Sequence, residues 1–198
     1  MNCTTQYDQK LISRSKTMLI FFRALFLLFA AIAIIPWLFP TSNLGYILLT
    51  MTPKASTLSF YNNNHLMDFL SSLTMATRAM GLVGSILSLF PMLAGSLIMI
   101  RLTKNYIHKE IFSLDNARAY TQLGVVFLLS ALLLAPITDA LMSLIATLHY
   151  PAGHNLRVIS VSFGSLNMTE IFLSIIFIIL GHVMKLGHKI SEEQELTV

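Results

Sequence analysis

The sequence predicts an all-α integral membrane protein with four transmembrane helices and a small extracytoplasmic β-element. Composition is the first observation behind this prediction: 55% of the 198 residues are hydrophobic and only 11% are charged. A soluble domain carries roughly 25% charged residues. The second observation is that the apolar residues gather in four runs, each long enough to cross a hydrocarbon core of about 30 Å.

The four runs divide the chain into a single membrane domain with three loops. The predicted spans are residues 17–39, 79–100, 123–148 and 164–184. Outer loops are predicted at 40–78 and 149–163, and a cytoplasmic loop at 101–122. The first run follows basic residues, as in a signal peptide, but it is too long for one and continues into further apolar residues. We therefore expect an uncleaved first span.

Parts of the two outer loops have the residue pattern of strands. Segments 46–51 and 56–61 flank a Thr-Pro-Lys turn, which is typical of a short hairpin. Residues 157–163 alternate apolar and polar side chains. We expect these segments to form the β-element together.

The basic residues indicate the orientation in the membrane. With four spans, both termini and the 101–122 loop share one side, which holds nine Lys and Arg residues against three on the other. The positive-rich side of a membrane protein is cytoplasmic. A pI near 9.3 is therefore explained by orientation in the membrane. The sequence has no basic stripe interleaved with aromatic residues, so we expect no direct nucleic-acid binding.

Two segments carry a family resemblance. The loop reads Glu110-Ile-Phe-Ser-Leu-Asp-Asn-Ala-Arg-Ala-Tyr-Thr-Gln-Leu-Gly124, and the chain ends Glu192-Glu-Gln-Glu-Leu-Thr-Val198. Both resemble motifs of a bacterial membrane family catalogued as domain of unknown function 2975. The resemblance implies a multi-pass protein of the bacterial inner membrane with no established activity. Its members often lie beside a gene for a small helix-turn-helix regulator, which implies a cytoplasmic DNA-binding protein as a partner.

The residue types of the loop motif also predict the start of a helix. Ser113 is predicted to cap the third span, with Asp115 and Asn116 in the first turn, where acceptor groups suit the helix dipole. Phe112 is predicted to fold against the following turn or the membrane surface. The motif either docks the loop or binds a partner. The candidate partner-binding residues are Phe112, Ser113, Asp115, Asn116, Glu193 and Glu195.

Ionisable residues inside the predicted spans form a second candidate site. Asp139 and Glu170 lie at similar depth in the third and fourth spans, and Arg78 stands at the outer end of the second. A charge inside the membrane costs several kcal/mol unless it is paired. We expect an intramembrane polar cluster of these three residues, which either fixes helix register or forms a proton or cation site.

Small residues line one side of the second span. Gly81, Gly84, Ser85 and Ser88 allow helix backbones to approach closely within lipid. This face serves either packing within the chain or a homo-oligomer.

No catalytic motif is evident in the sequence. His182 and His188 are six residues apart, which is not the spacing of two metal ligands on one helix face, and Cys3 is the only cysteine. We therefore expect no enzyme, no metal and no cofactor. The favoured function is a membrane regulator or scaffold that presents its cytoplasmic loop and C-terminal tail to a protein partner. The alternative is a small ion- or solute-coupled transporter that uses the intramembrane carboxylates.

Overall fold

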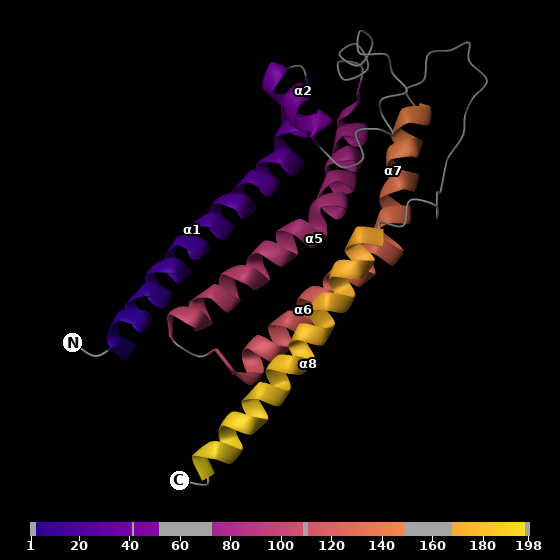
Figure 1. The fold of residues 1–198 in the computed structure, drawn as a ribbon. Helices are drawn as coiled ribbons and strands as arrows, with labels where there is room; N and C mark the ends of the chain where they lie inside the picture. The colour runs from indigo at the N-terminus through magenta and orange to yellow at the C-terminus, as the bar shows by residue number, and fades with distance from the viewer. Residues whose placement is uncertain (1–2, 41, 52–72, 109–110, 149–167, 197–198) are drawn as a thin grey trace. The chain divides into compact units, whose positions relative to one another are not determined.

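A computed structural model describes residues 3–40, 42–51, 73–108, 111–148 and 168–196 (Figure 1). Their regular structure is helical throughout. The helices are α1 (Cys3–Leu38), α2 (Asn43–Thr50), α5 (Met75–Ile107), α6 (Leu114–Leu129), a π-helical turn (Ser130–Leu134), α7 (Ala135–Leu148) and α8 (Met168–Leu196). Four segments are long and apolar enough to cross a membrane: Ile12–Leu38, Met75–Ile107, Leu114–Ile145 and Met168–Gln194. The predicted multi-pass, all-helical membrane protein is confirmed.

The helices run beyond the apolar segments that predicted them. Helix α8 continues to Leu196, well past the polar boundary of the fourth span. In this extension His188 lies 3.3 Å from Glu192 and Lys189 lies 4.0 Å from Glu193, both at i,i+4 spacing. A Lys–Glu pair at this spacing stabilises a helix in water by about 0.2–0.5 kcal/mol. The length of an apolar run therefore marks the hydrocarbon layer rather than the end of the helix.

The predicted β-element is wrong where the structure describes it. Residues Asn43–Thr50 form α2, so Tyr46 and its neighbours are helical rather than extended. The Ser42 hydroxyl caps this helix by accepting a hydrogen bond from the Gly45 amide at 3.0 Å. Leu49 then packs into an apolar core, which favours the helix over a strand. The other two segments, 56–61 and 157–163, lie outside the described residues.

The third span contains a π-helical turn just before a proline. The Ala135 amide donates to the Ser130 carbonyl, five residues back. Pro136 has no amide hydrogen to donate, and in a regular α-helix its ring clashes with the carbonyl four residues earlier. The widened turn accommodates both effects. Turns of this kind occur frequently at functional sites.

The described residues belong to two compact units. The first comprises Met1–Leu27, Met92–Leu128 and Met168–Val198, and the second comprises Leu28–Pro91 and Leu129–Asn167. The first unit thus includes the N-terminal part of α1, the C-terminal part of α5, and α8 with nearly all of α6. The second includes the end of α1, helix α2, the N-terminal part of α5, the π-helical turn and α7.

Trp37 organises the core of the second unit. Its indole N–H donates a 2.6 Å hydrogen bond to the Ser85 hydroxyl, and its ring lies directly on Gly81, where a Cβ would overlap it. A Cβ on Gly84 would lie 3.1 Å from the Met142 methyl group. Three members of the small-residue face of α5 are therefore covered by residues of the same chain, and Ser88 is half-buried.

In the first unit, α6 and α8 approach each other closely through two glycines (Figure 1). A Cβ on Gly124 would lie 2.6 Å from the Ser174 carbonyl oxygen, and one on Gly181 would lie 2.9 Å from the Ala117 carbonyl oxygen. Both neighbours are backbone atoms, which cannot turn away as a side chain does. The absence of a side chain at these positions therefore permits the crossing.

Candidate functional site

The α5–α6 loop leads into α6 through a side-chain cap. The Asn116 amide donates to the Ser113 hydroxyl at 3.2 Å, and the Ala117 amide donates to the Ser113 carbonyl at 3.1 Å. Helix α6 accordingly begins at Leu114, with Asp115 in its first turn. The predicted cap at Ser113 is confirmed.

Asn116 connects both sides of this loop. Its side chain is 0% exposed, and its carbonyl oxygen accepts a 2.7 Å hydrogen bond from the Asn105 side-chain amide near the end of α5. Its own amide donates to the Ile111 carbonyl at 2.9 Å. One buried side chain thus joins α5, the loop and α6. Burying a side-chain amide away from water is unfavourable unless its donor and acceptor atoms form such hydrogen bonds.

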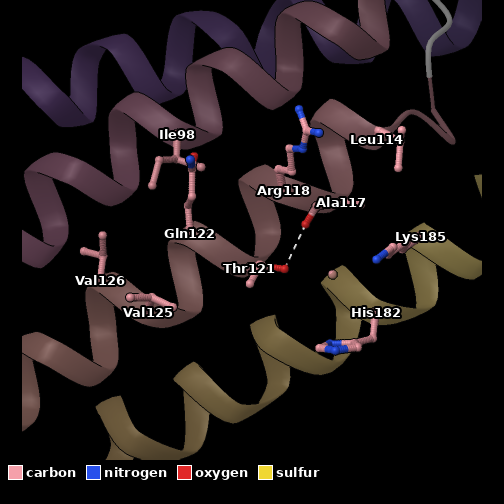
Figure 2. Close-up of a pocket in the computed structure, with 11 residues that line it drawn as sticks. Ile98, Leu114, Ala117, Arg118, Thr121, Gln122, Val125, Val126, His182 and Lys185 are labelled. Atoms are coloured by element: carbon pink, nitrogen blue, oxygen red, sulfur yellow. Dashed lines mark hydrogen bonds between the residues drawn. The ribbon is translucent and has the colours of Figure 1, made fainter.

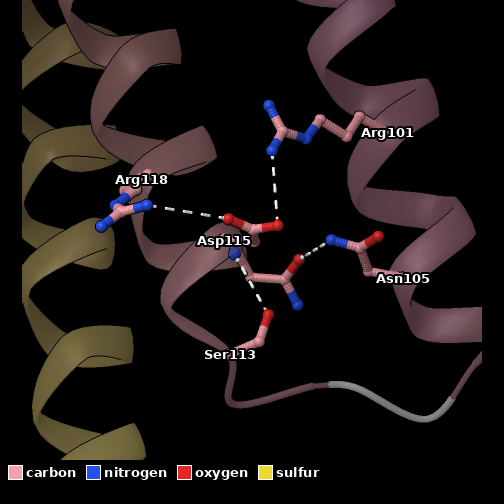
Figure 3. A network of polar contacts seen from close by, with 6 residues as sticks. Arg101, Asn105, Ser113, Asp115 and Arg118 are labelled. Atoms are coloured by element: carbon pink, nitrogen blue, oxygen red, sulfur yellow. Dashed lines mark hydrogen bonds and ion pairs between the residues drawn. The ribbon is translucent and has the colours of Figure 1, made fainter.

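Asp115 forms ion pairs on the outside of the same turn. Figure 3 shows its carboxylate between Arg101 of α5 and Arg118 of α6, at 3.5 Å and 4.0 Å respectively. All three side chains are more than half exposed. Exposed pairs contribute about 0–1 kcal/mol each, whereas leaving a buried polar group unsatisfied costs about 1–3 kcal/mol. The Asn116 hydrogen bonds therefore hold the loop more strongly than the ion pairs do.

Phe112 docks the loop on α8. A Cβ on Gly187 would lie 2.7 Å from the Phe112 ring, and the Phe112 carbonyl lies 3.0 Å from the His188 Nδ1. The ring therefore packs on another helix, whereas the sequence had suggested its own following turn or the membrane surface. Phe112 remains 53% exposed, so it contacts α8 with one side and leaves the other side available.

The C-terminal candidates lie on the last turns of α8. Glu193 is exposed and lies 4.0 Å from Lys189, and Glu195 belongs to the helical segment that ends at Leu196. Because Phe112 contacts α8 at Gly187, the loop and the polar end of α8 meet on one part of the first unit. We call this surface the loop face and define it by Phe112, Asp115, Arg101 and Arg118.

The intramembrane candidates are divided between the two units. Asp139 is buried, at 5% exposure, in α7 of the second unit. Arg78 belongs to the same unit, and its Nε atom is buried and makes no hydrogen bond within the described residues. Glu170 stands in the first turn of α8, in the first unit, and is half-buried. A cluster of all three remains a prediction.

Several residues in or next to the loop face were missed in the sequence. Asn105 and Arg101 hold Asn116 and Asp115 from α5, and the Tyr106 hydroxyl lies 2.7 Å from the Tyr120 hydroxyl. The available signal was the clustering of polar side chains at the end of the second span and the start of the third. In the described part of the chain, no group of three His, Cys, Asp or Glu side chains is placed to hold a metal ion.

Comparison with known proteins gives a match to a family model. No curated protein and no solved structure matches the chain. One family model matches residues 17–198, and its description is "Protein of unknown function (DUF2975)". The match covers all four predicted spans, the loop face and the C-terminal motif. The chain therefore belongs to the DUF2975 family.

Proposed function

We propose that this chain is a non-enzymatic regulator or scaffold of the bacterial inner membrane, with both termini in the cytoplasm. Its partner is a cytoplasmic protein, of which a small helix-turn-helix regulator is the leading candidate. The partner contacts the loop face and the C-terminal tail, including Glu193 and Glu195. The protein acts by holding or releasing this partner at the membrane.

The proposal rests mainly on the fixed conformation of the α5–α6 loop. A loop that only links two spans does not need a fully buried Asn116 bonded to both flanking helices. Here that residue fixes a loop that carries an exposed aromatic ring, Phe112, and an exposed carboxylate, Asp115, which is paired with two arginines. Aromatic and arginine side chains are frequent anchors of protein interfaces, and a preorganised surface loses less entropy on binding.

The composition of the first unit supports the proposed orientation. It contains the N-terminal part of α1, the loop face and the polar end of α8. These are the segments whose basic residues give the nine-to-three charge bias. The contact of Phe112 with Gly187 brings the loop and the tail helix together, so one partner can reach both.

Photocrosslinking tests the partner directly. A photoreactive residue at Lys104 or Gln194, both exposed, is expected to capture a small soluble DNA-binding protein in native membranes. The same probe at Ile47, exposed on α2 in the predicted outer region, is the matched control and is expected to capture none. Adding Asn116→Ala is expected to lower the yield at Lys104, because the loop loses its fixed conformation.

Self-crosslinks alone at Lys104 and Gln194 would contradict the regulator proposal. They would favour a homo-oligomer, for which the small-residue face at Gly81, Gly84, Ser85 and Ser88 is the other candidate surface. In the structure, Trp37 and Met142 cover three of these four residues. That packing supports a role within the chain for this face.

The transporter alternative rests on a separate observation. Asp139 is buried within a candidate span, five residues after Leu134, where the π-helical turn ends. Intramembrane carboxylates are costly and commonly belong to ion or proton pathways. Ion flux into proteoliposomes that disappears in Asp139→Asn would favour the transporter. The regulator proposal expects no flux in either protein.

A further inference from the structure

A groove of about 700 Å³ lies beside the loop face, entirely within the first unit (Figure 2). It is bordered by the C-terminal part of α5, by α6 from Leu114 to Val126, and by α8. Its volume falls within the roughly 300–1,000 Å³ that is usual for small-molecule sites. The neighbouring glycine crossing at Gly181 holds the backbones of α6 and α8 together, so one side of the groove is rigid.

The groove has a basic end and an apolar end. Arg118 and Lys185 line it from α6 and α8, together with the imidazole of His182. Ile98 and Val125 line its apolar part. Val125 follows Arg118 by seven residues on the same helix face, which is about 10 Å along the axis. No carboxylate is among the described residues that line the groove.

The basic end lies where two candidate spans change from polar to apolar. Arg118 and Gln122 precede the apolar run that begins at Leu123, and Lys185 follows the apolar run of α8. In the described part of the chain, the ion pair of Arg118 is a 4.0 Å contact with the exposed Asp115 carboxylate, which is a weak restraint. Lys185 makes no ion pair with any described residue. Both cations are therefore available to an anion at the membrane surface.

We propose that this groove binds an anionic phospholipid from the leaflet at the loop face. Arg118 and Lys185 hold the phosphate, and one acyl chain lies along Val125 and Ile98. A phosphate alone does not use the apolar part. A zwitterionic lipid carries no net charge to balance Lys185 and the weakly paired Arg118. Basic pockets between transmembrane helices are suited to anionic headgroups. The site does not depend on the proposed protein partner.

Native mass spectrometry of the full chain in detergent tests the headgroup end. Dioleoylphosphatidylglycerol is expected to bind more tightly than dioleoylphosphatidylcholine. The double variant R118Q/K185Q is expected to bind dioleoylphosphatidylglycerol about tenfold more weakly than the unaltered chain. The matched control K104Q/K189Q removes the same charge from exposed positions outside the groove lining and is expected to retain the preference. An equal loss in the control, or no headgroup preference, would overturn the proposal.

A second pair of variants tests the acyl end and separates a lipid from a free anion. Val125→Phe fills the apolar part of the groove without changing its charge. The variant is expected to bind dioleoylphosphatidylglycerol more weakly than the unaltered chain. Val183→Phe, at an exposed position of α8 outside the lining, is the control and is expected to have no effect. Excess inorganic phosphate is expected not to displace the lipid. Displacement by phosphate, or unchanged binding in Val125→Phe, would show an anion site that does not use the groove.

Discussion

Asn116→Ala is expected to lower the free energy of unfolding by about 2–3 kcal/mol. The substitution removes the acceptor for the Asn105 amide and the donor to the Ile111 carbonyl at a site that is 0% exposed. Because those groups lie between α5 and α6, the loop also loses its connection to both helices. A reversible unfolding titration in mild detergent measures the change.

Asp115→Ala is the matched control for this prediction. Asp115 precedes Asn116 in the same helical turn but is exposed, and among the described residues it makes only the ion pairs with Arg101 and Arg118. Its loss is expected to cost about 0–1 kcal/mol. An effect of Asp115→Ala as large as that of Asn116→Ala would mean that surface charge, rather than the buried amide, holds the loop.

Gly124→Ala and Gly181→Ala are each expected to destabilise the chain by about 1–3 kcal/mol. A methyl group at Gly124 meets the Ser174 carbonyl oxygen at 2.6 Å, and one at Gly181 meets the Ala117 carbonyl oxygen at 2.9 Å. Relief requires α6 and α8 to move apart, since backbone atoms cannot rotate away. Unfolding titrations of the single variants measure the cost.

Gly95→Ala provides the comparison within the same unit. A Cβ there lies 3.4 Å from the nearest neighbour, a methyl group of Leu123, which is ordinary contact. Alanine also has a higher helix propensity than glycine by about 1 kcal/mol. Gly95→Ala is therefore expected to be neutral or stabilising. Equal destabilisation by all three substitutions would contradict a close crossing specific to α6 and α8.

The sequence predicted the features that depend on local pattern. Run lengths identified the four membrane-spanning segments, because hydrocarbon thickness sets a minimum apolar length. The cap at Ser113 was also predicted, since capping involves residues three apart. The strand predicted at residues 46–51 was wrong because a short apolar run fits either a strand or a helix. The segment is helical because Ser42 caps the helix and Leu49 packs into the apolar core.

The long-range contacts of the loop face were not predictable from pattern. The bond between Asn105 and Asn116 and the contact of Phe112 with Gly187 join different helices, and no spacing rule relates their positions. The same holds for Trp37 and Ser85, which are 48 residues apart. A single sequence records the residue types at these positions but not which of them meet.

Accessibility labelling tests most directly whether the loop face is cytoplasmic. Cys3→Ser removes the only cysteine, and a new cysteine is then placed at Lys104 or at Ile47, both exposed. With a membrane-impermeant thiol reagent, the proposed topology predicts that Ile47→Cys reacts in intact cells and that Lys104→Cys reacts only after permeabilisation. Reaction of Lys104→Cys in intact cells would place the loop face outside and would contradict a cytoplasmic partner.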